Sequence, residues 1–272
     1  MKVALLQMTA GIDPLDNAAV LVRSARQAAA AGATILFTPE MSGLLDRDRV
    51  RAAGSITREQ DDPVLRAVRE AAAETGIWLQ LGSLALRRED GRLANRSFVI
   101  DPSGAVRARY DKMHLFDVDL ANGERWRESD SYAAGAEPVV AAGPDAMIGL
   151  SICYDLRFPD LYRTMSDAGA TIMSVPAAFT RPTGAAHWHV LLRARAIEAG
   201  CFVVAAAQTG RHEDGRETYG HSLVVDPWGE VLLDMGEAPG IGYAEIDHAR
   251  LADVRSCVPA LRHRRAIPAV RR

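Results

Sequence analysis

The nonapeptide AGATILFTP at residues 31–39 recurs as AGATIMSVP at residues 168–176, with six of the nine residues identical. Each copy follows a stretch with helical periodicity, residues 17–31 and residues 158–168. A glycine just after such a stretch is typical of a helix end, and the apolar run behind it is typical of a buried strand. The repeated nonapeptide therefore predicts that one helix–strand unit occurs twice in the chain.

A second pair of segments matches in the same order. GIWLQL (residues 76–81) follows a predicted helix over residues 64–75, and GCFVVA (residues 200–205) follows a predicted helix over residues 187–199. Glycine again stands where a helix ends and an apolar strand begins. Helix-stop chemistry alone could explain one such match, but two matches in the same order favour an internal repeat.

The third pair consists of two hairpins. SFVIDPSGAV (residues 97–106) and SLVVDPWGEV (residues 222–231) each join two apolar strands through a DPxG turn. Each half of the chain thus runs strand, helix, strand, helix, strand, hairpin. Alternation of this kind predicts an α/β fold in which helices cover the sheets. We expect two sheets stacked face to face with helices outside, forming one domain over residues 1–272.

The composition is that of an ordinary globular protein, with 272 residues, 48% of them hydrophobic and 25% charged. A formal net charge of −3 gives no basis for binding nucleic acid or an anionic membrane. Arginines gather near the C-terminus, where we expect a solvated or subunit-contacting tail over about residues 257–272. Between the halves, residues 112–137 are rich in Asp, Asn, Gly, Glu and Ser and predict a long functional loop.

The location of the protein is predicted from its N-terminus and its cysteines. MKVALLQMTAG is apolar only briefly, so we interpret it as a first strand and not as a signal peptide. No apolar run is long enough to span a bilayer. Cys153, Cys201 and Cys257 are an odd number in a long chain and favour free thiols in a reducing compartment. These features predict a soluble, cytoplasmic protein.

Cys153 stands in GLSICYDLRFP (residues 149–159), between a predicted strand over residues 146–152 and a helix opening at residues 156–162. Amide groups at a helix N-terminus favour a thiolate and can hold a developing oxyanion. A covalent nucleophile would be placed at such a turn. The other reading is a buried cysteine that only packs, as we expect for Cys201 and Cys257. The local sequence leaves both readings of Cys153 open.

Two charged residues become candidates because of the repeat. Glu40 ends the first TP strand, and the repeat predicts that strand ends at equivalent points of the halves meet. An isolated buried carboxylate is costly, so a solvated loop position is the alternative. Lys112, in YDKMHLFD, has apolar neighbours where an exposed lysine is the usual outcome. An ammonium beside a thiolate and a carboxylate could stabilise the oxygen of a tetrahedral intermediate.

These segments together resemble a known family. TPE at Glu40, DKMHLFD at Lys112 and GLSICYDLRFP at Cys153 are similar to the nitrilase superfamily of carbon–nitrogen hydrolases, over essentially the whole chain. AHWHVLLRARAIEAGCFVVAAAQTG (residues 186–210) and GHSLVVDPWGEV (residues 220–231) resemble its Nit branch. That branch contains amidases of deaminated glutathione and ω-amidases, and the chain resembles the former more closely.

The resemblance implies a four-layer α-β-β-α sandwich that forms a homodimer or a higher homo-oligomer, without a metal or an organic cofactor. It implies that Cys153 is the nucleophile and that Glu40 is the general acid and base. Lys112, with the backbone N–H of Tyr154, would stabilise the oxyanion. Glu128, in RESDSY, would position Lys112 or the substrate amide.

The implied reaction is hydrolysis of a small-molecule amide through a cysteine thioester, with release of ammonia. Our first expectation is an ω-amide that carries a free carboxylate, such as deaminated glutathione. An α-ketoglutaramate-type ω-amide, an N-carbamoyl amide and a nitrile are alternatives within the same chemistry. A catalytically silent dimeric scaffold is the hypothesis from another class, and the joint presence of the four residues above speaks against it.

Residues for the substrate are predicted near the nucleophile and at the start of the helix after the second repeat. Arg157 follows Cys153 by one helical turn and could bind a carboxylate bidentately or pair with Asp155 or Asp160. Arg181 and Thr183, in FTRPTG, should border the pocket because their strand end is equivalent to that of Glu40.

Four histidines form two pairs that could ligate a metal ion. His187 and His189 form an HxH pair, but no third ligand is evident, and His212 with His221 is a weaker pair. We therefore predict no metal site. His189 also stands where Nit proteins usually carry glutamate, so it bears on substrate preference more than on the chemistry.

Overall fold

The computed structural model describes residues 1–119, 123 and 125–271, and two six-stranded sheets form the centre of this part of the chain. The first sheet has the order β16 (Gly240–Glu245), β1 (Lys2–Gln7), β2 (Ile35–Phe37), β3 (Trp78–Arg87), β4 (Leu93–Ile100), β5 (Val106–Asp111). The second has the order β15 (Val231–Asp234), β14 (Leu223–Val225), β11 (Phe202–Ala205), β10 (Ile172–Ser174), β9 (Ala146–Leu150), β8 (Val139–Gly143).

The internal repeat is confirmed by the strand pairing. β1, β2 and β3 are mutually parallel neighbours, as are β9, β10 and β11 in the second sheet. In each sheet the third of these strands continues into an antiparallel hairpin, β4–β5 or β14–β15. Each sheet also gains one antiparallel strand beside its first strand, β16 beside β1 and β8 beside β9. The two halves therefore share one topology, and of the strands in the two six-stranded sheets only β8 and β16 were not predicted from the sequence.

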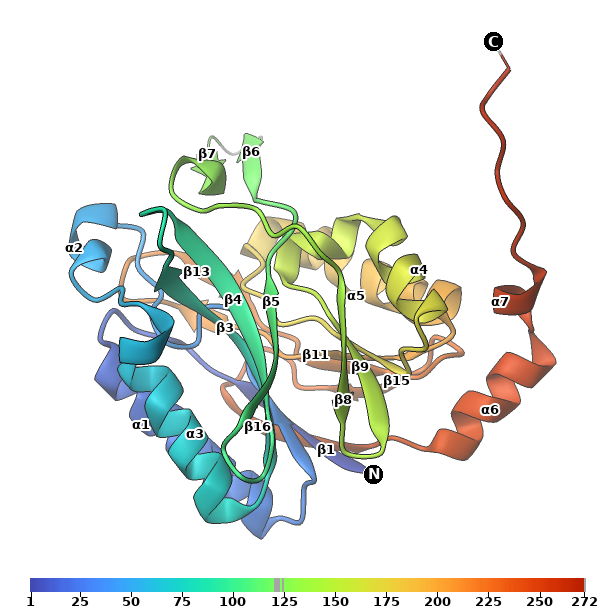
Figure 1. Cartoon of the computed structure of the whole chain (residues 1–272), viewed down its shortest axis with the longest axis horizontal. Helices are drawn as coiled ribbons and strands as arrows, with labels where there is room; N and C mark the ends of the chain where they lie inside the picture. Colours follow the sequence, from blue (N-terminus) through green and yellow to red (C-terminus); the bar gives the residue numbers. More distant parts are fainter. Residues whose placement is uncertain (120–122, 124, 272) are drawn as a thin grey trace.

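Helices cover the outer face of each sheet (Figure 1). Helices α1 (Pro14–Ala30) and α3 (Pro63–Thr75) pack on the first sheet, and α4 (Pro159–Asp167) and α5 (Arg181–Ala199) lie on the opposite side of the molecule. Asp13 and Asp62 cap the first pair of helices through their side chains. The α-β-β-α sandwich expected from the family resemblance is thus the observed fold.

Period-2 alternation in the strands fills both layers of the core. In β1, Val3 and Leu5 point between the sheets, whereas Ala4 and Leu6 point to the helices α1 and α3. Successive side chains of a strand face opposite sides of a sheet, so a strand that is covered on both faces must be apolar throughout. This explains why the strands of the repeat are continuous apolar runs.

Smaller elements complete the described chain. They are the helices α2 (Arg49–Ala53), α6 (His248–Cys257) and α7 (Ala260–His263), the 3₁₀ turns η1 (Glu59–Asp61), η2 (Glu128–Asp130) and η3 (Cys153–Arg157), and the two-stranded sheets β6 (Asp117–Asp119)–β7 (Arg125–Arg127) and β12 (Thr209–Arg211)–β13 (Glu217–Tyr219). The loop predicted over residues 112–137 contains β6, β7 and η2, and its residues 120–122 and 124 lie outside the described residues. The chain from α6 onward projects away from the two sheets (Figure 1).

Three local predictions were wrong. The helix expected to open at residue 156 begins only at Pro159, because η3 intervenes. Helix α5 begins at Arg181 and not at residue 187. Its first turn packs closely on Tyr219, and glycine at position 184 permits this because a Cβ there would stand 2.3 Å from the Tyr219 ring. Cys257 is exposed and not a packing residue, whereas Cys201 is buried as predicted.

In the described part of the chain, no helix has both the length and the apolar character that crossing a membrane requires.

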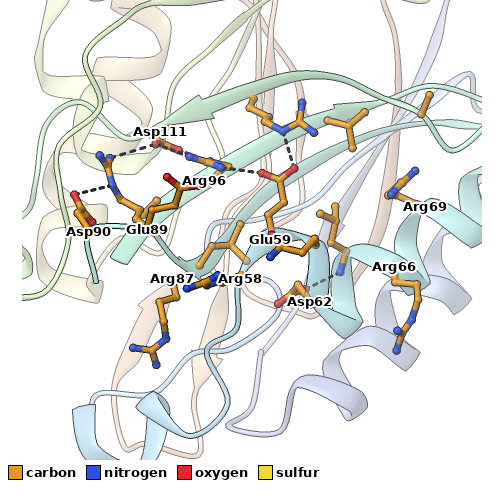
Figure 2. A pocket seen from close by; sticks show the side chains of 18 residues that line it. Arg58, Glu59, Asp62, Arg66, Arg69, Arg87, Glu89, Asp90, Arg96 and Asp111 are labelled. Atoms are coloured by element: carbon orange, nitrogen blue, oxygen red, sulfur yellow. Dashed lines mark hydrogen bonds and ion pairs between the residues drawn. The ribbon is translucent and has the colours of Figure 1, made fainter. Parts of the chain in front are cut away.

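A cavity of about 1100 Å³ lies between α3, the η1 turn and the strands β3 to β5. Figure 2 shows that charged side chains line it and pair with one another. Arg96 is the central cation, because it donates to both oxygens of Asp111 at 2.6 and 2.9 Å and to Glu59 at 2.8 Å. Of the residues predicted to carry chemistry, none lines this cavity, so we interpret its charges as a structural network.

Replacing Arg96 by alanine is expected to destabilise the fold, because Glu59 and Asp111 then face each other without their shared cation. The expected loss is about 1–3 kcal/mol in the free energy of unfolding, measured by urea denaturation. Arg109→Ala is the matched control. Arg109 pairs only with Glu59 and its side chain is 49% exposed, so its removal should cost about 1 kcal/mol or less. Equal losses in the two variants would contradict the central position of Arg96.

Candidate active site

Cys153 lies at the turn that follows β9 and is the first residue of η3. Its φ of 49° is in the left-handed region, which a residue other than glycine adopts only when its surroundings hold it there. Its backbone N–H donates to the carbonyl of Pro176 at 2.8 Å. Pro176 ends the second copy of the repeated nonapeptide, so the repeat itself fixes the backbone of the cysteine.

Asp155 holds this turn against the loop that carries Lys112. Its side chain is fully buried and accepts from the backbone N–H of Ile152 at 2.9 Å and from the hydroxyl of Tyr110 at 2.7 Å. The backbone N–H and Nδ1 of His114 contact its other oxygen at 3.0 and 2.7 Å. Asp155 therefore binds elements of both halves. The salt bridge of Asp155 with Arg157, one alternative for that arginine, is not formed among the described residues.

Glu40 directly follows the first nonapeptide, at the strand end equivalent to that of Pro176, and is only 5% exposed. Its Oε2 accepts from the backbone N–H of Ala178 at 3.0 Å, just beyond the second nonapeptide. Strand β3 approaches the backbone before Glu40 closely, because a Cβ on Gly82 would stand 2.0 Å from the carbonyl oxygen of Thr38. The strand ends of the two halves therefore meet, as the repeat predicts, and Glu40 is not a solvated loop residue.

Lys112 follows β5 and is 2% exposed, in contrast to the exposed lysine that is the usual outcome. Its Nζ donates to Glu40 Oε1 at 3.0 Å and to both oxygens of Glu128, at 3.2 and 2.8 Å. Glu128 is held in turn by the backbone N–H of Phe116, which donates to Oε2 at 2.7 Å. One buried ammonium is therefore shared by two carboxylates.

The charges of this cluster shift two pKa values. Burial alone would lower the pKa of Lys112, but Glu128 and Glu40 outweigh it and hold the pKa well above its usual value. Burial raises the pKa of the Cys153 thiol, and the charge of Glu40 and its hydrogen bond with the thiol raise it further, although Lys112 acts in the opposite direction. The ammonium is thus retained and the resting thiol is protonated.

The protonated thiol differs from the thiolate expected at a helix N-terminus. Cys153 begins a 3₁₀ turn of five residues, and α4 starts only at Pro159, so no long helix is aimed at the sulfur. Burial of the thiol, together with the negative charge of Glu40 beside it, keeps the thiol protonated. Deprotonation of Cys153 must therefore be coupled to proton acceptance by a neighbouring base.

Glu40→Gln is expected to lower the pKa of Cys153, because a neutral amide no longer opposes a second negative charge and Lys112 remains. The thiolate absorbance near 240 nm, taken as the difference from a Cys153→Ser protein, should rise at lower pH in the Glu40→Gln protein than in the wild type. A thiolate step at the same or a higher pH in the variant would show that Glu40 does not raise this pKa.

Asn95, on β4, is a site residue that the sequence analysis missed. Its Nδ2 donates to Glu40 Oε1 at 3.0 Å and to Glu128 Oε1 at 3.2 Å, and its backbone carbonyl accepts from the N–H of Lys112. It is 1% exposed, and its Oδ1 has no hydrogen-bond partner among the described residues. β4 carries two further polar residues, Arg96 and Ser97, so no sequence signal marked Asn95.

The candidate substrate residues are spread over two elements. Tyr154 and Arg157 lie on η3, and the Arg157 guanidinium lies over the rings of Tyr154 and Phe179 at 5.8 and 5.6 Å. Arg157 forms no salt bridge within the described residues, and its NH2 lies 3.3 Å from Nδ1 of His187. It therefore remains available to an anionic group.

The other two candidates have partners within the first turn of α5 or just outside it. Arg181 donates to both oxygens of Glu237 at 2.9 and 3.0 Å. The hydroxyl of Thr183 lies 2.8 Å from that of Thr180, the residue that precedes the helix. Their contacts support the start of the helix, and the structure gives neither a link to the Glu40–Lys112–Cys153 cluster.

Comparisons with known proteins agree with this geometry. The family model described as carbon–nitrogen hydrolase matches residues 2–256. The chain is 40% identical over 269 residues to the deaminated glutathione amidase of Yersinia enterocolitica, covering 98% of this chain and 93% of that protein.

Solved structures give the same result. The NitFhit protein of Caenorhabditis elegans superposes with a TM-score of 0.90 at 38% identity, over 97% of this chain and 65% of that longer chain. Nit3 of Saccharomyces cerevisiae, a member of branch 10 of the nitrilase superfamily, has a TM-score of 0.86 at 26% identity, over 95% of this chain and 94% of that chain. The chain therefore belongs to the carbon–nitrogen hydrolase family, in the Nit branch of the nitrilase superfamily, and is an enzyme that cleaves carbon–nitrogen bonds other than peptide bonds in small amides.

Proposed function

We propose that the enzyme hydrolyses the primary amide of a small molecule that carries a free carboxylate, with deaminated glutathione as the first candidate. The observation that supports the reaction most strongly is the buried ammonium of Lys112, shared by Glu40 and Glu128 beside the Cys153 thiol. The substrate rests on the relative of 40% identity whose name gives deaminated glutathione.

In the first half of the proposed reaction, Cys153 Sγ attacks the amide carbonyl carbon while Glu40 takes the thiol proton. The oxygen of the tetrahedral intermediate becomes negative, and the Lys112 ammonium with the Tyr154 backbone N–H stabilises it. When the intermediate collapses, the carbon–nitrogen bond breaks and Glu40 returns its proton to the nitrogen. Ammonia leaves, and the acyl group remains on Cys153 as a thioester.

In the second half, a water molecule attacks the thioester and Glu40 takes its proton. A second tetrahedral intermediate breaks the carbon–sulfur bond, the carboxylic acid leaves and the thiol is regenerated. Glu128 and Asn95 act as positioning residues. Glu128 accepts from the Lys112 ammonium, and Asn95 donates to the carboxylates of Glu40 and Glu128. Glu128 and Glu40 hold the pKa of Lys112 well above its usual value, so the ammonium is charged in the resting enzyme.

The experiment for this function is an ammonia-release assay of the purified enzyme. The panel contains deaminated glutathione, α-ketoglutaramate, an N-carbamoyl amino acid and a simple nitrile. We expect the highest kcat/KM for deaminated glutathione. A clear preference for the nitrile or the N-carbamoyl compound would overturn the proposed substrate, and activity on none of the four would overturn the class of small amide.

Arg157 is the residue that we assign to the substrate carboxylate. Arg157→Gln is expected to raise KM for a carboxylate-bearing amide by about 10–100-fold with little change in kcat, since one charge-assisted interaction is lost. KM for a neutral amide of similar length should stay the same. Arg181→Gln is the control, because Arg181 pairs with Glu237. A raised KM in the Arg181 variant alone would place the carboxylate at the start of α5.

We also propose a homodimer in a reducing compartment such as the cytoplasm, with residues 1–272 as one domain and about residues 257–272 contacting the second subunit. Ile197 on α5, Trp228 and Val258 are more than half exposed, and they line one apolar groove of about 450 Å³. Light scattering of the whole chain and of a chain ending at Cys257 tests this. The dimer should weaken on truncation, and a monomeric whole chain would contradict the proposal.

A further inference from the structure

His189, His221 and Asp234 form a cluster that the sequence pairs did not indicate. His189 lies on α5, His221 between β13 and β14, and Asp234 at the end of β15. Nε2 of His189 lies 3.0 Å from Asp234 Oδ2, and Nδ1 of His221 lies 2.9 Å from Oδ1 and 3.2 Å from Oδ2. One donor atom from each residue lies within 4.8 Å of the others.

These donors have the chemistry and the spacing of a transition-metal site. Two imidazole nitrogens and a carboxylate oxygen are a ligand set of open zinc sites, in which water takes the fourth position. In a tetrahedral zinc site, donor atoms about 2.1 Å from the ion are roughly 3.4 Å from one another. With Oδ2 as the carboxylate ligand, the two histidine–aspartate distances are 3.0 and 3.2 Å, a few tenths of an ångström below this value. All three donor atoms lie within 4.8 Å of one another, so rotations of the three side chains would bring them around one ion.

The backbone holds His221 in a conformation that needs support. Its φ is 54°, its N–H donates to Gly236 O at 2.6 Å and its carbonyl accepts from Trp188 Nε1 at 2.8 Å. The ring stacks on Tyr219 with centroids 4.4 Å apart. Asp234 is fixed as well, because the N–H of Gly236 donates to Oδ1 at 2.9 Å. Left-handed residues kept in place by several contacts are frequent at ligand sites.

The cluster is accessible from solvent. The side chains of His189, His221 and Asp234 are 33%, 20% and 34% exposed, so an ion could enter and retain a water ligand. The other histidines of the sequence pairs do not take part. His187 contacts Arg157, and His212 is buried between the carbonyl of Ala10 and the hydroxyl of Thr218. Of the HxH pair only His189 takes part, and its two partners, His221 and Asp234, come from distant segments.

We propose that His189 Nε2, His221 Nδ1 and the Asp234 carboxylate bind one divalent transition-metal ion, with zinc as the best-fitting ion. Imidazole nitrogen favours zinc and its neighbours over magnesium or calcium. The ion would replace the present contacts between the histidines and the aspartate. It would join α5, the β13–β14 connection and the edge strand β15. None of its ligands belongs to the Glu40–Lys112–Cys153 cluster.

The test is a calorimetric titration of the whole untagged protein with Zn²⁺, together with cobalt absorption spectroscopy. We expect one ion per chain, a cobalt spectrum without a thiolate charge-transfer band, and a rise in melting temperature of about 5–10 °C at a free zinc concentration 100 times Kd. His189→Ala and Asp234→Asn should each raise Kd by at least about 100-fold, whereas His187→Ala should leave it unchanged. Circular dichroism of the metal-free variants verifies that they fold.

Three results would overturn the proposal. The first is zinc binding in the His189→Ala and Asp234→Asn proteins equal to that of the wild type. The second is a loss of binding in Cys153→Ala but not in those two variants, which would place the ion at the thiol. The third is the absence of binding by the wild type at up to millimolar zinc.

Discussion

Replacing Cys153 by alanine is expected to lower the rate of ammonia release by about 10,000-fold or more, because no other group in the cluster can form the acyl intermediate. The melting temperature should change by only a few degrees. The thiol is small, and the backbone of the turn is held by Pro176 and Asp155. Ammonia release from the substrate panel and thermal unfolding measure the two quantities.

The matched controls for this prediction are the two other cysteines. Cys257→Ala should retain full activity, since Cys257 is exposed on α6. Cys201→Ala should also turn over, with some loss of stability because Cys201 is buried. Turnover by Cys153→Ala at the wild-type rate, or its loss in the Cys257 variant instead, would contradict the assignment of the nucleophile.

Replacing Lys112 by methionine is expected to affect both activity and stability. Activity should fall by about 100–1,000-fold or more, because the positive charge for the oxyanion is lost. The free energy of unfolding should fall by about 3–5 kcal/mol, because Glu40 and Glu128 remain buried without their cation. Steady-state kinetics and urea denaturation measure these losses.

A double variant separates the two effects of Lys112. Adding Glu128→Gln to Lys112→Met removes one uncompensated charge, so part of the stability should return while activity stays low. The chain has one other lysine, Lys2, whose Nζ donates to the carbonyl of Ala31, and Lys2→Met should be fully active. An active Lys112→Met protein would contradict the proposed role of the ammonium, whatever its stability.

The fold could be predicted from the sequence because the repeat is written in local signals. Each copy of the nonapeptide has a helix stop, an apolar strand and a proline in order, and each hairpin has its DPxG turn. These signals predict the same order of helices and strands in both halves, and the two six-stranded sheets have the same topology. β16 was missed because its partner, β1, lies at the other end of the chain. β8 was missed although it forms a hairpin with β9 through residues 144–145, because that turn is not of the DPxG kind that marks the two repeated hairpins.

The site was predictable only where the repeat or the family resemblance pointed to it. Glu40 follows the first nonapeptide strand, β2, and Cys153 follows β9, which pairs with β10, the counterpart of β2. Lys112 was indicated by its apolar neighbours and by the family resemblance. Asn95 and Asp155 carry no such mark. Their roles depend on which groups the fold brings within 3 Å of their side chains. His221 and Asp234 were likewise invisible as partners of His189, because they lie 32 and 45 residues away from it in the sequence.

The protonation state of Cys153 shows a further limit of local reasoning. A turn before a helix predicts a stabilised thiolate, but burial of the Cys153 thiol and the neighbouring carboxylate of Glu40 raise the pKa of the thiol instead. Because that carboxylate comes from the other half of the chain, the sequence around Cys153 does not contain it and could not predict its effect on the thiol. The same carboxylate is the base that the proposed reaction requires, so the feature that keeps the thiol protonated also removes its proton during attack.

The proposed thioester on Cys153 can be observed directly by mass spectrometry of enzyme quenched in acid during turnover of the best amide substrate. The account predicts a mass increase equal to that of the substrate minus ammonia. Peptide mapping should place it on Cys153, and it should be absent from the Cys153→Ala protein. Rapid ammonia release without any adduct on Cys153, or with the adduct on Cys257 alone, would contradict the account.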